Sequence, residues 1–205
     1  MVATFELETV ELALHGGPIA GVDKAGWGPL AGPVVAAAVV LEPQRIPEGI
    51  TSAKSLDGAT RARLNAAILT TARHVAVAVA GVDHIERQNV LNATLWAMAE
   101  AVARLGCEPK LVVVDGTKAP HLACATRAIP RGDAKCLSIA AASIVAKVAR
   151  DAIMLEIARD YPHYGFERHL GYGTREHLAA IKRYGATPEH RRSVRAVQLA
   201  LGLLS

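Results

Sequence analysis

The segment AGVDKAGWGPLAGPVVAAAVV, residues 20–40, carries the clearest indication of the fold of this chain. Apolar runs at residues 19–23 and 34–41 flank a segment rich in glycine and proline, which predicts two strands joined by a turn. Asp23 ends the first strand, and Lys24 follows it directly. A buried carboxylate is costly unless a cation pairs with it or it lies at an exposed edge. We therefore expect the end of this strand to carry a site.

Strand and helix patterns alternate along the rest of the chain. Strands are predicted at 74–82 and 110–116, with a short fifth strand within 124–133. Helical spacing is present at 58–74, 83–106, 137–160, 174–183 and 193–203, and Asp83 is the expected N-cap of the second of these helices. This order predicts an α/β fold in which helices cover both faces of a mixed sheet. Residues 163–177 lack clear periodicity, so we expect a surface segment with a function.

Composition limits the class of protein. With 205 residues, 51% of them hydrophobic, the chain is long enough for one globular domain with a substantial core. A net charge of +4 is compatible with a polyanionic partner, whereas 4% aromatic residues argue against a single-strand binder built on many stacking side chains. Three cysteines without a CxxC motif predict reduced thiols. The absence of a signal-peptide pattern and of a long apolar run then predicts a cytoplasmic protein that does not span a membrane.

Three aspartates are candidate metal ligands. Asp115 ends a second buried strand pattern, LVVVD, and Asp133 precedes a predicted helix. Because open α/β sheets place their sites at the C-terminal ends of strands, Asp23, Asp115 and Asp133 could form an oxygen-rich site suited to Mg²⁺ or Mn²⁺. The alternative is that each aspartate only caps a turn.

Several motifs in register resemble the ribonuclease HII family. They are GVDKAGWGPLAGPVVAAAVV, NVLNATLWAM, LVVVDG, GDAKCLSIAAASIVAKVARD, YPHYGFERHLGYGT and HRRS, and they extend from about residue 18 to the C-terminus. The resemblance implies a ribonuclease H-like fold with a central mixed five-stranded sheet, flanking helices and a small helical C-terminal part. It also implies a single domain, with the core at about residues 1–160 and the helical segment at about 161–205.

The resemblance further implies an endonuclease of DNA replication and repair. Such an enzyme hydrolyses the RNA strand of RNA–DNA hybrids and cuts 5′ of single ribonucleotides in duplex DNA. Its Mg²⁺ or Mn²⁺ ions would be held here by Asp23, Asp115 and Asp133, which match three of the family's four carboxylates. We expect a monomer whose partners are hybrids and ribonucleotide-containing duplex DNA, with no membrane partner.

The fourth carboxylate position departs from the family, because Lys24 stands where the family has glutamate. Three aspartates and one lysine carry a net charge of −2 instead of −4, which balances one divalent ion instead of two. We therefore expect only one ion, or weak binding. Lys24 is expected to pair with the aspartates; the alternative is that it points away, since neighbouring strand residues face opposite sides.

The expected substrate-binding residues include further departures. They are Gly26, Trp27, Gly28, Lys54 and Tyr172. Trp27 replaces an arginine of the family and Leu170 a lysine, while Ser52 and Ala53 replace an Asp-Ser pair before Lys54. Ser143, Lys147 and His169 form a second tier of candidate site residues. Most histidines, including His163 and His177, are expected at the surface.

Two functions therefore compete. One is an active but altered ribonuclease HII-type endoribonuclease. The other is a catalytically impaired homologue that binds hybrid or junction duplexes without efficient cleavage. A phosphotransfer enzyme on a related fold is disfavoured because the chain has no glycine-rich phosphate loop with a lysine.

Overall fold

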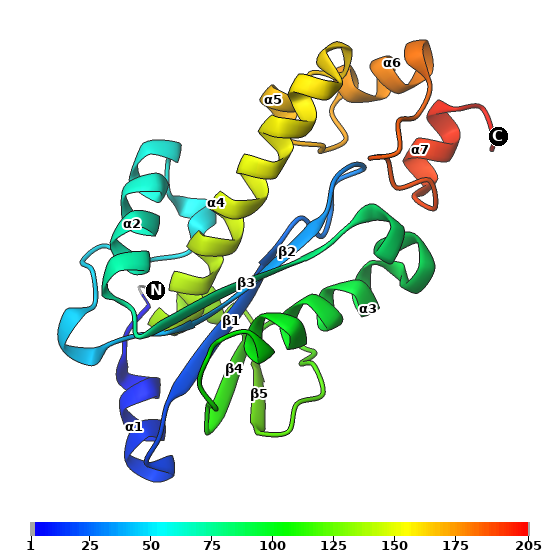
Figure 1. The fold of residues 1–205 in the computed structure, drawn as a ribbon. Coiled ribbons are helices and arrows are strands. Elements are labelled where there is room, and N and C mark those ends of the chain that lie inside the picture. Colours follow the sequence, from blue (N-terminus) through cyan, green and yellow to red (C-terminus); the bar gives the residue numbers. More distant parts are fainter. Residues whose placement is uncertain (1–2, 205) are drawn as a thin grey trace.

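One mixed five-stranded sheet forms the centre of the molecule, as predicted. The structure is a computed structural model that describes residues 3–204. The strands are β1 (Ile19–Ala25), β2 (Val34–Val40), β3 (His74–Ala80), β4 (Leu111–Asp115) and β5 (Ala125–Ile129), arranged in the order β3-β2-β1-β4-β5 (Figure 1). β2 is antiparallel to both β1 and β3, whereas β1–β4 and β4–β5 are parallel pairs.

Helices cover both faces of this sheet (Figure 1). The long helices are α3 (Val82–Ala103) on one face and α4 (Leu137–Asp160) on the other, where α2 (Gly58–Thr71) packs beside α4. Residues of β2 alternate between the two cores: Ala36 and Ala38 pack toward α3, and Ala37 and Val39 toward α2 and α4. This alternation is the period of two that a strand imposes, so small β2 side chains serve both layers.

Close contact between α4 and β1 depends on a glycine. A Cβ added at Gly21 would lie 2.1 Å from the carbonyl carbon of Ser138. The first turns of α4 are rich in alanine, and Ala140, Ala141 and Ala142 are fully buried. This helix therefore packs tightly on the sheet.

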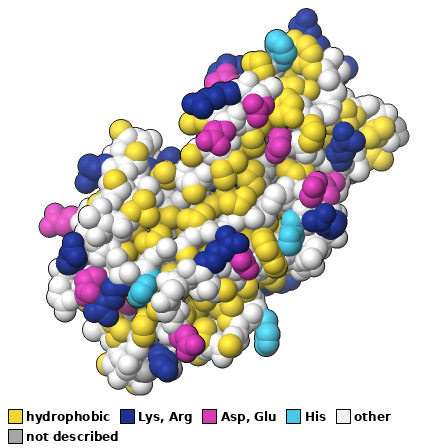
Figure 2. Space-filling view, in the orientation of Figure 1, with side chains coloured by type: hydrophobic (Ala, Val, Ile, Leu, Met, Phe, Trp, Pro, Cys, Tyr) yellow, Lys and Arg dark blue, Asp and Glu magenta, His cyan; other side chains and the backbone are white. Residues whose placement is uncertain are grey.

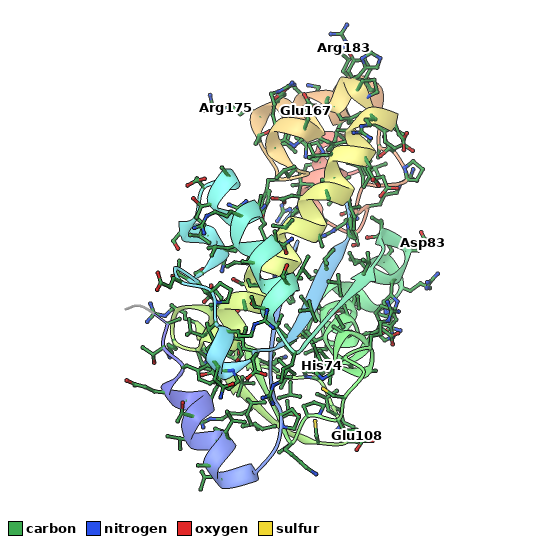
Figure 3. All side chains as sticks on the ribbon, turned by 60° about the vertical axis from the view of Figure 1, so that its left-hand side comes forward. His74, Asp83, Glu108, Glu167, Arg175 and Arg183 are labelled. Carbon is green, nitrogen blue, oxygen red and sulfur yellow. The ribbon has the colours of Figure 1, made fainter. Side chains whose placement is uncertain are left out.

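The remaining helices lie at the ends of the molecule. An N-terminal helix that the sequence did not predict, α1 (Glu6–His15), precedes β1. The C-terminal part contains α5 (Phe166–His169), α6 (Arg175–Tyr184) and α7 (Arg195–Ala200), and short 3₁₀ turns occur at Pro43–Arg45, Ala53–Ser55, Gly132–Ala134 and Pro162–Tyr164. Figure 3 shows Arg175 and Arg183 of α6 at the end of the molecule remote from His74 at the start of β3.

Two local predictions are wrong. Asp83 does not cap α3: the N-cap is Gly81, and Asp83 lies within the first turn at the outer edge of the molecule (Figure 3). The backbone of α3 also breaks at Asn89, whose φ is 65°.

Residues 163–177 are not purely a surface segment, since Phe166 is fully buried and Tyr164 nearly so. Aromatic packing there has no simple period and so gives no periodic signal.

The face of the molecule seen in Figure 2 carries a broad apolar area. Figure 2 shows hydrophobic side chains gathered across the middle of the molecule, between α2 and α3, with lysines and arginines scattered around them. Exposed Val79 lies on β3, which is an edge strand.

Within residues 3–204, no helix is both long and apolar enough to cross a membrane.

Candidate active site

Lys24 joins two of the predicted carboxylates. Asp23 is near the end of β1 and Asp115 is the last residue of β4; these strands are parallel neighbours, so their C-terminal ends lie at one sheet edge. The Lys24 Nζ donates to Asp115 Oδ2 at 2.6 Å and to Asp23 Oδ1 at 3.3 Å. The Lys24 amide also donates to Asp23 Oδ1 at 2.7 Å. The expected pairing is therefore present, and Lys24 does not point away.

Burial and charge oppose each other in this cluster. Burial raises the pKa of Asp23 to about 7, although the Lys24 ammonium acts against that shift. Burial also opposes ionisation of Asp115, but the hydrogen bond and charge of Lys24 hold the pKa of Asp115 below its ordinary value. Desolvation would lower the pKa of Lys24, yet the two carboxylates outweigh it and raise that pKa. Lys24 thus remains a fixed cation between the aspartates near neutral pH.

Asp133 enters the site from a different element. It lies in the 3₁₀ turn that precedes α4 and is 6% exposed. Ser52 Oγ donates to Asp133 Oδ2 at 2.5 Å, and the exposed Lys54 Nζ lies 3.8 Å from the same oxygen. The Gly132 amide donates to Asp115 Oδ1 at 2.9 Å, which ties this turn to the end of β4.

The loop of residues 26–33 after β1, called here the glycine loop, is held by a buried arginine. Arg191, 1% exposed, donates to the carbonyl oxygens of Gly26 at 2.6 Å, Trp27 at 2.9 Å and Gly32 at 2.8 and 3.0 Å. Gly26 has a φ of +92°, and a Cβ there would lie 2.4 Å from the Pro33 carbonyl oxygen. Glycine is therefore required at position 26 for both conformation and space.

Most of the predicted site residues line one cavity of about 530 Å³, called here the aspartate cavity. Asp23, Lys24 and Asp133 line it. All the predicted substrate-binding residues and two residues of α4 also line this cavity: Gly26, Trp27, Gly28, Lys54, Tyr172, Ser143 and Lys147. Ser143 Oγ accepts from the Ala53 amide at 3.0 Å, and Lys147 pairs with Asp151 at 2.6 Å.

His169 does not belong to this cavity. It is 8% exposed, its Nε2 lies 2.8 Å from the Tyr164 carbonyl oxygen, and its ring stacks on that of fully buried His177. Both histidines are therefore core residues, and the prediction that His177 lies at the surface is wrong. Leu170 also lies outside the cavity lining; its side chain packs in the small core beside α4.

Two arginines with clear structural roles escaped the sequence-based prediction. Arg191 fixes the glycine loop, and Arg150 of α4 donates to the carbonyl oxygens of Leu170 at 3.0 Å and Pro33 at 3.2 Å. Both are 1% exposed, and burial lowers the pKa of each; for Arg191 it falls to about 10. Arg150 interrupts an alanine-rich helical pattern, and this interruption is the sequence feature that could have identified it as a structural residue.

The side chains do not fit two divalent ions held by four carboxylates. The Lys24 ammonium already lies between Asp23 and Asp115. Across residues 3–204, no three His, Cys, Asp or Glu side chains are grouped as metal ligands. The metal-binding role of the three aspartates therefore stays a prediction.

Comparison with known proteins identifies the family. The family model for Ribonuclease HII matches residues 20–197. The chain belongs to the ribonuclease HII family. A Ribonuclease HII of Xanthobacter autotrophicus is 53% identical over 187 residues, which cover 90% of this chain and 75% of that protein.

Solved structures share the fold of this ribonuclease HII family member. The ribonuclease H2 of Pyrococcus horikoshii has a TM-score of 0.76 at 24% identity and covers 91% of this chain and 98% of its own. Bst-RNase HIII in complex with Mn²⁺ has a TM-score of 0.68 at 18% identity, covering 91% and 70% respectively. The expected ribonuclease H-like fold is thereby confirmed. Family membership also makes the chain a hydrolase of the endoribonuclease class that acts on RNA–DNA hybrids.

Proposed function

We propose that this ribonuclease HII homologue recognises RNA–DNA hybrids and single ribonucleotides in duplex DNA and cuts 5′ of the ribonucleotide, slowly. The observation that carries the proposal is the aspartate cavity. Asp23, Asp133, the glycine loop and Tyr172 converge on it, although they come from three separate parts of the chain, and Lys24 ties Asp115 to its edge. Slow cleavage follows from Lys24, which supplies a positive charge where the family has a carboxylate.

Recognition is assigned to the glycine loop and its surroundings. Gly26 and Gly28 let a sugar–phosphate backbone approach closely, and Tyr172 lines the same cavity. A 2′-hydroxyl distinguishes RNA from DNA, and close contact with the backbone is needed to detect it. Lys54 is 85% exposed and is assigned to a phosphate.

The aspartate cavity is assigned one divalent metal ion instead of two. Bst-RNase HIII, which has the same fold, forms a complex with Mn²⁺. Three aspartates and Lys24 together balance one divalent ion, and an ammonium close to a second ion position repels that ion. We therefore propose a single, weakly bound Mg²⁺ or Mn²⁺, with Asp133 and Asp23 as ligands and Asp115 retained by Lys24.

The Lys24–Asp115 ion pair also favours a second candidate function, which is binding without efficient cleavage. A homologue whose catalytic aspartates are neutralised by an internal ammonium would bind junction duplexes without efficient cleavage. This candidate keeps the recognition surface and loses only the hydrolytic step.

Cleavage of a duplex DNA with one internal ribonucleotide tests the proposal. Wild type, Lys24→Glu and Lys182→Glu are compared in Mg²⁺ and in Mn²⁺ on denaturing gels; Lys182 on α6 gives the same charge change far from the cavity. We expect slow wild-type cutting 5′ of the ribonucleotide. Lys24→Glu should be about tenfold faster or more, which corresponds to about 1.4 kcal/mol of barrier. Lys182→Glu should match wild type.

Three results decide between the candidates. Equal rates for wild type and Lys24→Glu would contradict the assigned effect of Lys24. Tight binding of the duplex by wild type without product, with cutting restored in Lys24→Glu, would favour the non-cleaving homologue. Equal binding of the ribonucleotide-containing duplex and an all-DNA duplex would overturn the assigned recognition itself.

A further inference from the structure

A second cavity borders the aspartate cavity on its α3 side. It has a volume of about 500 Å³ and is called here the α3-side pocket. Leu91, Thr94, Leu95 and Met98 of α3 line it, together with Gly116, Thr117 and Lys118 after β4. Asp115 at the end of β4 also lines it, and Lys24 neutralises this carboxylate at 2.6 Å. Lys24 and Trp27 line both cavities, so these two residues separate them. A strand that passes over the aspartate cavity therefore reaches this pocket across Trp27.

The walls of the pocket suit a flat molecule with an anionic tail. Leu91 and Leu95 are half-buried apolar residues, and exposed Thr117 adds a hydroxyl at the mouth. Lys118 is exposed and makes no ion pair with any residue in the described range 3–204. Apolar walls beside a free cation match a nucleotide, whose base has apolar faces and whose phosphate is anionic.

Trp27 is the side chain best placed to select such a ligand. It is 43% exposed, although tryptophan buries well elsewhere in proteins. Its backbone is fixed, because Arg191 Nη1 donates to its carbonyl oxygen at 2.9 Å. An exposed indole on a fixed backbone is a stacking surface for any base, whereas the arginine found here in the family would instead contact a phosphate.

We propose that the α3-side pocket binds the base of a nucleotide next to the scissile phosphate, with Trp27 as its stacking surface and Lys118 as a phosphate contact. The inference rests on the proposed recognition of ribonucleotide-containing duplexes and extends it to a base-binding subsite. The base leaves its pair in the duplex to enter the pocket, and the stacking contact offsets this unpairing. Because every base has a π-face, this subsite tolerates all sequences.

Base removal tests the subsite directly. Duplexes with one ribonucleotide carry a single abasic site at successive positions around the junction, and affinity is measured by fluorescence anisotropy in EDTA, where no cleavage occurs. One abasic position should weaken wild-type binding about tenfold, which is the effect of one lost stacking contact. The same position should have no effect in Trp27→Leu, since the stacking partner is already gone. Trp96→Leu removes a similarly exposed tryptophan from α3 and should behave as wild type.

Tryptophan emission gives a second readout. Trp27 and Trp96 are the two tryptophans of the chain, so Trp96→Phe leaves Trp27 as the only indole. Adding the duplex should quench that emission, and the abasic duplex should quench it less. Lys118→Ala should lower the slope of log affinity against log salt by about 1.

The outcomes separate the subsite from the proposed function. Preference for a ribonucleotide-containing duplex without sensitivity to any abasic position, or without quenching of Trp27, overturns the base-binding subsite alone. Loss of that preference in wild type overturns the proposed function. Sensitivity at one position that disappears in Trp27→Leu supports the subsite.

Discussion

Arg191→Lys tests how the glycine loop is held. The guanidinium makes four hydrogen bonds to the carbonyl oxygens of Gly26, Trp27 and Gly32, over 2.6–3.0 Å. A lysine keeps the charge but lacks the planar fork, so it cannot reach all three carbonyl groups at once. The substitution therefore separates the geometry of this side chain from its charge.

The expected loss follows from counting these contacts. A hydrogen bond from a charged donor contributes about 1.5–3 kcal/mol, and a buried carbonyl left without a donor costs about 1–3 kcal/mol. Loss of two such bonds predicts a fall of about 3 kcal/mol in the free energy of unfolding. Displacement of Gly26 and Trp27 should also weaken binding of a ribonucleotide-containing duplex about tenfold, equal to about 1.4 kcal/mol.

Urea unfolding and anisotropy in EDTA measure the two effects. The neighbouring Arg192 is exposed, so Arg192→Lys is the matched control and should change stability by less than about 0.5 kcal/mol. If Arg191→Lys unfolds within about 1 kcal/mol of wild type and binds the duplex equally well, the loop does not depend on this arginine.

Three further predictions concern the scaffold. Gly21→Ala should destabilise the protein by about 3 kcal/mol in urea unfolding, because the new Cβ would lie 2.1 Å from the Ser138 carbonyl carbon; a loss under about 1 kcal/mol would contradict this close packing. Burial lowers the pKa of His177 and of His190 from 6.5 to about 4, so ¹⁵N NMR should show neutral rings down to that pH; midpoints near 6.5 would refute this. Because the unfolded chain binds a proton at each histidine near pH 6.5 and the folded chain only near pH 4, each histidine contributes about 3 kcal/mol of stability above about pH 6.5, and this contribution is lost as the pH falls toward 4. Glu8 Oε1 accepts from the Ser138 amide at 2.7 Å; Glu8→Ala should cost about 2 kcal/mol in urea unfolding and Glu8→Gln, which keeps an acceptor, clearly less, whereas equal costs would exclude this hydrogen bond as the cause.

Local patterns were sufficient for most of the fold. The five strands and the sequence limits of α4 follow from hydrophobic periodicity, which acts over a few residues. α1 was missed because its N-cap residue is Phe5, which gives no helix-start signal, and the Asp83 prediction failed because Gly81 is the N-cap of α3. The predicted cavity residues came mainly from the family resemblance, and the structure brings nearly all of them together.

Short-range sequence patterns were sufficient for the order of strands and helices and for the placement of Asp23 and Asp115 near strand ends. Only the folded structure shows that Lys24 lies between those aspartates, one of them 91 residues away in the chain. It also decided that Arg191 holds Gly26, 165 residues away, and that His177 is buried. The physical reason is that a buried polar or charged side chain is stable only with its partners, and these partners come from distant parts of the sequence.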